Sequence, residues 1–351
     1  MLVKLLKSFR IMLSPVVVIY GFIIKVRNYF FDKGIFHEKK VNAKIIAVGN
    51  ITVGGSGKTP AVMYITNLLK NAGYKVGILS RGYRRKTKGY LLVSKGEEID
   101  LKVEEYGDEI VMVTNECMVP TAVSERRVGG VNKFLKDVAL DAVVLDDAYQ
   151  HRWIHRDLNI MMIDQRFLTK KETLEQKLLP LGLMREPFSS TDRADIIIIN
   201  KKFSEKIEIP ERLKKFFPAE KTFYGFYEAK GIFDLKTHHF YKIEEFTGQK
   251  SLVVCGIARP YSFLNVLEKN KINITNKLLF DDHQEYTVKE VQQIRKKFYD
   301  TNSFSVLTTQ KDAVKLAAFS RELDDIDIYY LKIDLMVENN EEFNKRIIKI
   351  F

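Results

Sequence analysis

The sequence predicts an α/β fold: a parallel sheet of the kind found in phosphate-loop kinases, a smaller α/β domain after it, and a helix before it. Short, almost continuous apolar runs alternate with helical stretches, which is typical of parallel strands covered on both faces. A glycine-rich turn follows the first such run, at residues 45–48. Residues 222–245 instead alternate aromatic and polar side chains, which predicts an antiparallel hairpin that links the two domains.

The first element is a helix with an apolar stretch from Ile11 to Ile24. This stretch would span about 21 Å, which is short of the ~30 Å hydrocarbon core of a bilayer. Polar and small side chains fall on one narrow face of the helical wheel: Lys7, Arg10, Ser14, Gly21, Lys25 and Asn28. We therefore expect residues 1–31 to lie in a membrane interface, with basic groups toward anionic headgroups, and Pro15 to kink the helix or to start its second half.

Two other interpretations of the N-terminal helix stay open. A signal peptide has the same basic-then-apolar order, but no small-residue cleavage site follows the apolar stretch. A helix that simply packs on the following domain needs no membrane.

The glycine-rich turn predicts a phosphate-binding loop. Glycines let successive backbone N–H groups surround phosphate oxygens, and the following helix N-terminus adds partial positive charge. Lys58 would reach the β- and γ-phosphates, and the Thr59 hydroxyl would coordinate Mg²⁺. Thr52 stands where the usual pattern has glycine. The residues expected to bind ATP are Thr52, Val53, Gly54, Gly55, Ser56, Gly57, Lys58, Thr59 and Pro60.

The remaining elements follow from the same patterns. Helices are expected over residues 58–70, from Asp108 and Glu109, whose negative charges suit a helix start, and, beyond the hairpin, from 261 and over 287–299. Strands are expected at 75–80, 120–123, 142–146, 158–164, 195–200, 251–255, 304–308 and 328–333. A chain of 351 residues has room for two domains, which we place at 32–225 and 226–351.

Asp146 and Asp147 end an apolar run and are the expected Mg²⁺ ligands. In phosphate-loop enzymes a carboxylate at such a strand end holds the ion directly or through water. Two adjacent carboxylates are unfavourable unless a cation or hydrogen bonds compensate them. The pattern therefore predicts a metal-assisted nucleotide site.

A GTPase is the natural competitor. Asn200-Lys201-Lys202-Phe203 follows an apolar run, as a guanine-reading Asn-Lys-x-Asp motif would, but Phe203 replaces the aspartate. Asp147-Ala148-Tyr149-Gln150 likewise lacks the glycine of the usual Asp-x-x-Gly switch. Both departures favour ATP.

Three further residues are candidates for the chemistry. Asp108 could accept a proton from a hydroxyl acceptor, and His283 could orient or relay it. Arg185 lies in an apolar loop and could place a guanidinium on developing phosphate charge. His151 and His155 have helical ligand spacing but no partner glutamate between them, so zinc is a poor interpretation.

The net charge of +12 suggests an anionic partner. The basic residues are dispersed or lie near the loop and the N-terminus, and no nucleic-acid-binding motif is present, so we expect no nucleic-acid partner. The two cysteines, Cys117 and Cys255, are far apart, which fits a reducing compartment.

Distinctive motifs lie at 48–60, 79–83, 107–109, 145–152, 179–187, 194–195, 256–258, 282–283 and 308–314. They run along nearly the whole chain, and together they resemble the tetraacyldisaccharide 4'-kinase family of lipid A synthesis. Threonine in place of glycine at the position of Thr52 is usual in this family. The departures are Ala148 for glycine, Ser56 for threonine and Gln284 for a second histidine, and none removes a group that the reaction needs.

The resemblance implies transfer of the ATP γ-phosphate to the 4'-hydroxyl of a tetraacylated disaccharide 1-phosphate, a lipid A precursor, giving lipid IVA at the cytoplasmic face of the inner membrane. It implies Asp108 as base paired with His283, and Lys58 and Thr59 on phosphate and Mg²⁺. It places Asp146, Asp147 and Glu109 around the metal. The remaining matches to family active-site residues are Arg127, Gln150, His151 and Arg185.

Two other functions stay open at this point. A membrane-associated ATPase switch would use the same loop, with the charge and the N-terminal helix serving to dock a partner or lipid. A kinase of a soluble sugar or nucleoside would use it with a merely structural helix.

Overall fold

The computed structural model describes residues 2–97, 102–257, 260–282 and 284–351. The chain divides into two compact units. Unit 1 comprises Met1–Arg81, Ser124–Gly225 and Val337–Phe351, and unit 2 comprises Gly82–Val123 and Phe226–Met336. One division falls between Gly225 and Phe226. Residues 82–123 nevertheless group with the C-terminal unit, because helix α4 packs against helix α9, a contact that local sequence patterns do not reveal.

Five strands of unit 1 form a parallel sheet in the order β7-β6-β1-β5-β2. The strands are β1 (Lys44–Asn50), β2 (Val76–Ser80), β5 (Ala142–Leu145), β6 (Leu158–Asp164) and β7 (Ile196–Lys202). Nearly every residue in them is buried, as continuous apolar runs require when both faces of a sheet are covered. The strand expected at 142–146 ends one residue earlier, at Leu145.

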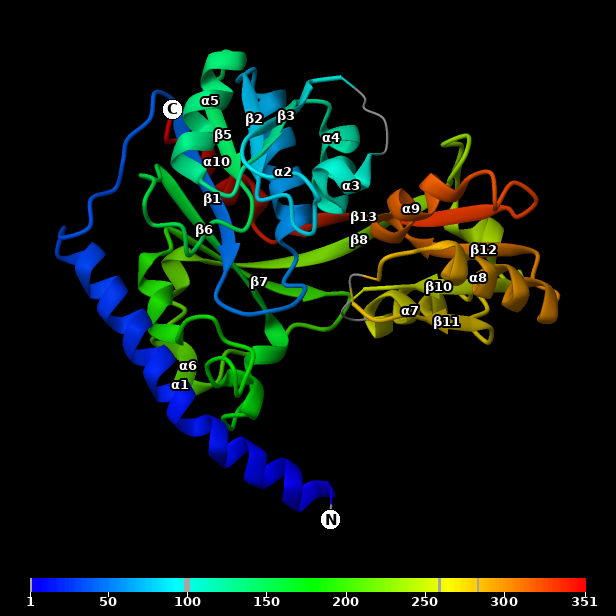
Figure 1. The fold of residues 1–351 in the computed structure, drawn as a ribbon, viewed down its shortest axis with the longest axis horizontal. Coiled ribbons are helices and arrows are strands. Elements are labelled where there is room, and N and C mark those ends of the chain that lie inside the picture. The colour runs from blue at the N-terminus through cyan, green and yellow to red at the C-terminus, as the bar shows by residue number, and fades with distance from the viewer. Residues whose placement is uncertain (1, 98–101, 258–259, 283) are drawn as a thin grey trace. The chain divides into compact units, whose positions relative to one another are not determined.

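Helices accompany these strands in unit 1 (Figure 1). They are α1 (Leu2–Asp32), α2 (Lys58–Asn71), α5 (Arg127–Asp137), α6 (Glu211–Lys214) and α10 (Asn340–Ile348). Helix α2 contacts β1, β2 and β5, and it also packs against α10, which comes from the end of the chain. The Tyr64 hydroxyl donates a hydrogen bond to Asn344 Oδ1 at 2.9 Å across that contact.

Unit 2 combines a parallel set of strands with antiparallel pairs. Its strands are β3 (Leu91–Lys95), β4 (Pro120–Val123), β8 (Thr222–Asp234, which begins in unit 1), β9 (Phe240–Tyr241), β10 (Ser251–Cys255), β11 (Lys277–Leu279), β12 (Ser305–Thr309) and β13 (Ile328–Val337). Strands β11, β10, β12 and β13 are adjacent and parallel. Strand β8 pairs antiparallel with β9, as the aromatic alternation predicted.

The helices of unit 2 are α3 (Val103–Tyr106), α4 (Asp108–Cys117), α7 (Pro260–Lys269), α8 (Val288–Asp300) and α9 (Gln310–Leu316). Its core lies between β10, β12, β13 and helix α8. Strand β3, which the sequence did not predict, pairs antiparallel with β4. The predicted mixed α/β fold with mostly parallel strands is therefore confirmed.

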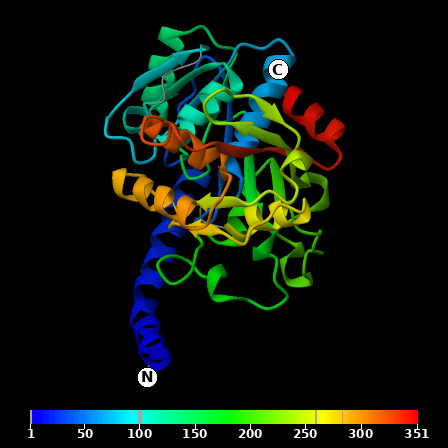
Figure 2. The same cartoon turned by 90° about the vertical axis from the view of Figure 1, so that its right-hand side faces the viewer.

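Helix α1 continues through Pro15. Its N-terminal part projects away from the rest of unit 1 in both views (Figures 1 and 2). Ile24 and Phe31 are buried, whereas Val18, Ile19, Phe22 and Ile23 are exposed. The helix therefore has one side against the protein and an apolar side that is uncovered.

Candidate active site

The glycine-rich turn connects β1 to α2 in unit 1. Gly57 caps helix α2 in the left-handed conformation (φ 96°) and Gly54 has the same φ, a region that side chains disfavour. The helix then begins at Lys58. The strand, turn and helix stand in the order that a phosphate-binding loop requires.

Two buried asparagines hold this loop in shape. Asn50 Nδ2 donates to Ser56 Oγ at 2.9 Å, and Asn200 Nδ2 donates to the Ser56 carbonyl at 3.0 Å. Asn200, considered above as a guanine reader, contacts the loop backbone from the end of β7. Sequence reasoning missed both roles, although a buried asparagine at a strand end is a signal that could have been followed.

Asp147 lies between two cations of unit 1. Its Oδ1 is 3.5 Å from Lys58 Nζ, and Arg185 Nη1 donates to both carboxylate oxygens at 3.0 and 3.1 Å. Burial would raise the pKa of this carboxyl, but the charges of Lys58 and Arg185 outweigh it and lower the pKa to about 2. Asp147 is therefore ionised at neutral pH. It also has a left-handed backbone (φ 48°), which the neighbouring Ala148 does not need to adopt.

Arg127 is hydrogen-bonded to the backbone of the turn that contains Asp146 and Asp147. Its guanidinium donates to the carbonyl of Asp146 at 2.7 Å, and the Asp146 carboxylate accepts from Ser80 Oγ at 3.2 Å. Burial lowers the pKa of Arg127 to about 10, so its positive charge remains at neutral pH. In this structure Arg127 fixes the backbone of the two-aspartate turn.

Gln150 and His151 lie after that turn. Gln150 Nε2 donates to the carbonyl of Asn50 at 2.8 Å, next to the start of the loop. Burial, with a contribution from the positive charge of Arg127, lowers the pKa of His151 to about 4. His151 is therefore neutral at pH 7 and supplies no positive charge there.

Asp108 and Glu109 open helix α4 in unit 2, beside two lysines of α9. Asp108 Oδ2 is 3.3 Å from Lys315 Nζ and 3.8 Å from Lys311 Nζ, and Glu109 Oε1 accepts from Lys311 at 2.8 Å. Burial acts to lower the pKa of Lys311, but the two carboxylates outweigh it and raise the pKa. The lysine partners were not predicted, although their i, i+4 spacing on α9 places them on one face. His283, the expected partner of Asp108, lies outside the described residues.

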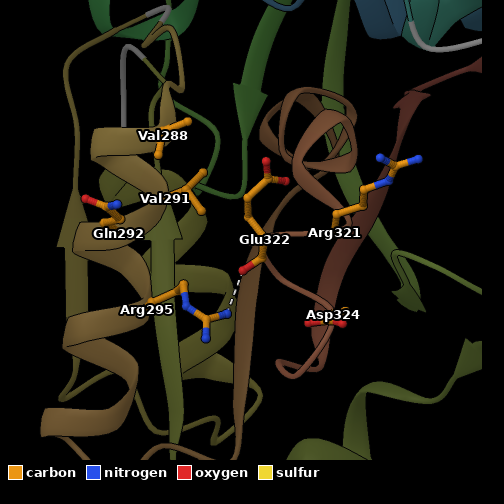
Figure 3. A pocket seen from close by; sticks show the side chains of 7 residues that line it. All are labelled: Val288, Val291, Gln292, Arg295, Arg321, Glu322 and Asp324. Atoms are coloured by element: carbon orange, nitrogen blue, oxygen red, sulfur yellow. Dashed lines mark hydrogen bonds between the residues drawn. The ribbon is translucent and has the colours of Figure 1, made fainter.

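A surface pocket of unit 2 contains none of the predicted site residues (Figure 3). Helix α8 contributes Val288, Val291, Gln292 and Arg295 to its lining. Arg295 donates to the carbonyl of Glu322 at 2.5 Å and forms an ion pair with Asp325. These contacts connect helix α8 to the surface segment that contains Glu322 and Asp325. They offer no reactive group. Over the described ranges, no cluster of three or more His, Cys, Asp or Glu side chains has the arrangement of a metal site.

Comparison with known proteins agrees with these motifs. The family model described as tetraacyldisaccharide-1-P 4'-kinase matches residues 9–351. Curated tetraacyldisaccharide 4'-kinases of Phocaeicola vulgatus and Aquifex aeolicus are each 33% identical; the alignments cover 95% and 97% of this chain and 93% and 98% of theirs.

A solved structure shares the fold. The "apo" form crystal structure of the Aquifex aeolicus enzyme in complex with ATP superposes with a TM-score of 0.79 at 32% identity, and the match covers 98% of this chain and 99% of that one. The matches run through both units. The chain therefore belongs to the tetraacyldisaccharide 4'-kinase family.

Proposed function

We propose that Lys58 and the loop of unit 1 hold the ATP phosphates while Asp108 of unit 2 activates the lipid hydroxyl. As a member of its family, the protein is an ATP-dependent lipid kinase that phosphorylates the 4'-position of a tetraacyldisaccharide 1-phosphate and makes lipid IVA. The observation that carries the loop assignment is the cluster of Lys58, Asp147 and Arg185 at the start of α2.

The oxygen-bearing side chains of Asp147 and its neighbours Asp146 and Thr59 would suit Mg²⁺. The ion prefers oxygen ligands and usually takes one or two carboxylates together with substrate phosphates and water. Asp147 is ionised, and we assign the metal to Thr59, Asp146 and Asp147, with Glu109 as a further carboxylate. When bound, the ion neutralises charge on the phosphates.

In the proposed reaction Asp108 acts as general base. The 4'-oxygen forms a bond to the γ-phosphorus as the bond from that phosphorus to the bridging oxygen of ADP breaks, and the hydroxyl proton passes to the Asp108 carboxylate. Lys58 and Arg185 stabilise the charge on the transferring group. Arg127, Gln150 and His151 hold the surrounding turn, and His283 is proposed as the partner of Asp108.

Transfer of labelled phosphate from ATP to tetraacyldisaccharide 1-phosphate in detergent micelles tests this assignment. We expect labelled lipid in the presence of Mg²⁺ and none after chelation. Hydrolysis of ATP without labelled lipid would favour the ATPase switch instead. Transfer to water-soluble sugars or nucleosides at a comparable rate would favour a kinase of soluble acceptors.

Helix α1 is proposed to rest on the cytoplasmic face of the inner membrane. Val18, Ile19, Phe22 and Ile23 present an uncovered apolar side, and such a side inserts readily at the boundary of headgroups and acyl chains. Within the described part of the chain, no helix combines the length and apolar character needed to cross a bilayer. A lipid substrate and an interfacial helix are consistent with each other.

Replacing Ile19 and Phe22 together by serine should weaken binding to vesicles of phosphatidylethanolamine and phosphatidylglycerol by at least ~10²-fold, because each side chain contributes about 1.5–3 kcal/mol when buried. Co-sedimentation with the vesicles measures this. The control is Phe304→Ser in unit 2, because Phe304 is 71% exposed and Phe22 is 66% exposed. Equal co-sedimentation of the double variant and the control would contradict the proposal that α1 binds the membrane surface.

A further inference from the structure

The inner side of helix α1 is fitted to the loop that carries Arg185. At Gly21 the helix comes so near that a Cβ atom there would lie 3.0 Å from Leu178 Cδ1. Gly21 and Asn28 belong to the face that the sequence suggested would turn to lipid headgroups. Both instead lie on the protein side, because the loop beneath needs close approach and hydrogen-bond donors.

The first polar contact reaches Arg185 itself. The Tyr20 hydroxyl donates to the Arg185 carbonyl at 2.9 Å. On its other side the same segment is bonded to the phosphate-loop strand, since Arg185 N donates to the Ile51 carbonyl at 2.8 Å and Val53 N donates to the Leu183 carbonyl at 2.7 Å. The Arg185 backbone is thus held between α1 and the loop that receives phosphate.

The second contact is the fully buried carboxylate of Glu186. Its oxygens accept from Asn28 Nδ2 at 2.9 Å and Ser190 Oγ at 3.0 Å, and they lie 3.4 Å from Arg27 and 2.8 Å from Arg193. A buried carboxylate is unfavourable unless it is paired and hydrogen-bonded. Two of its four partners, Arg27 and Asn28, belong to α1. The position of this helix therefore determines whether the Glu186 carboxylate, next to Arg185, keeps its full set of hydrogen bonds and ion pairs.

A third contact ties α1 to the segment after the two aspartates. The Arg152 guanidinium pairs with Asp32 at 2.8 Å, donates to the Asn28 carbonyl at 3.2 Å and stacks on the Phe31 ring with 4.9 Å to its centroid. Asp147 precedes Arg152 by one short turn. Helix α1 is therefore bonded to the segments that carry both members of the Arg185–Asp147 pair.

We infer that Tyr20 and Glu186 are positioning residues through which helix α1 holds Arg185 against Asp147. This inference rests on the proposed role of Arg185 in stabilising the transferring phosphate. The helix proposed to meet the lipid surface is then also the support of a catalytic cation. The alternative is that these contacts stabilise the fold and leave the reaction untouched.

A double-mutant cycle distinguishes a positioning role of Tyr20 from a purely structural one. Tyr20→Phe removes one hydroxyl, and we expect kcat for lipid phosphorylation to fall about three- to tenfold, the scale of one lost hydrogen bond. The matched control is Tyr64→Phe, which also removes a partly buried tyrosine hydroxyl bond of 2.9 Å in unit 1. We expect it to lower the thermal unfolding midpoint by a similar amount and to leave kcat at the wild-type value.

The third member, Arg185→Ala, should lower kcat about 10²-fold. In that background Tyr20→Phe should have no further effect, because the group that it positions is gone. Glu186→Gln keeps the shape of the side chain and should act in the same way. Glu186→Gln is a second test of the positioning role. If this variant fails to fold, the result for Tyr20→Phe alone decides whether α1 positions Arg185.

The outcomes are distinct. If Arg185→Ala is impaired but Tyr20→Phe matches Tyr64→Phe in kcat, or if the Tyr20 and Arg185 losses multiply, the positioning role is wrong and the proposed role of Arg185 stands. If Arg185→Ala retains wild-type kcat, the proposed role of Arg185 fails and the inference fails with it.

Discussion

Replacing Lys58 by alanine should lower kcat for lipid phosphorylation by at least about 10²-fold, the scale of removing one preorganised group that stabilises transition-state charge. Lys58 also partners Asp147, at 3.5 Å. Its loss leaves Arg185 as the near cation, so the pKa of Asp147 should move upward from about 2. We expect kcat to fall even at saturating ATP, measured by transfer of label to lipid.

The control for this variant is Lys44→Ala. Lys44 begins the same strand that leads into the loop, but its ammonium pairs with Asp157, at 3.0 Å, instead of with a site residue. A partly exposed pair of this kind contributes little to stability. Near-normal phosphorylation by the Lys58 variant would contradict the loop assignment, whereas equal losses in both variants would indicate damage to strand β1.

Replacing Asp108 by alanine should lower kcat by at least ~10²-fold, the usual contribution of a general base. The structure adds an electrostatic consequence, because Lys311 and Lys315 lie 3.8 and 3.3 Å from the carboxylate. Removing the negative charge leaves two ammonium groups close together, so the pKa of Lys311 should fall from its raised value. Initial rates over a range of lipid concentrations separate kcat from KM.

Two further variants make the Asp108 result specific. Asp108→Asn keeps the size of the side chain but cannot accept the proton, and should lose as much activity as Asp108→Ala. Glu116→Ala removes a carboxylate from the same helix, one that accepts from Gln310 at 2.6 Å and pairs with Lys332. It should retain normal turnover. An active Asp108→Asn variant would exclude Asp108 as the base.

Much of unit 1 could be predicted because its determinants are local. The strand before the glycine-rich turn and the helix after it are encoded within residues 45–70, and Gly54 and Gly57 occupy the left-handed positions that favour glycine. Buried parallel strands have continuous apolar sequences, which is why β6 of unit 1, and likewise β10 of unit 2, appear with the expected bounds.

The parts that could not be predicted depend on contacts between distant segments. Arg185 and Asp147 are 38 positions apart and Asn200 and Ser56 are 144 apart, and no local pattern pairs them. Strand β3 has five residues, of which Ser94 and Lys95 are polar, and it pairs antiparallel with β4. The helical wheel of α1 grouped Gly21 and Asn28 with basic residues, but it could not show that these two lie against the loop that contains the buried Glu186.

The Glu186 cluster also constrains how this sequence can diverge. Removing one member of a buried ionic group costs about 3–5 kcal/mol, whereas exchanging the whole group for apolar side chains of similar volume is often neutral. Glu186, Arg193 and the donors on α1 therefore cannot drift one at a time. We therefore expect substitutions in the N-terminal helix to be coupled to substitutions in a loop about 160 positions later, because both contribute to the same buried ionic group.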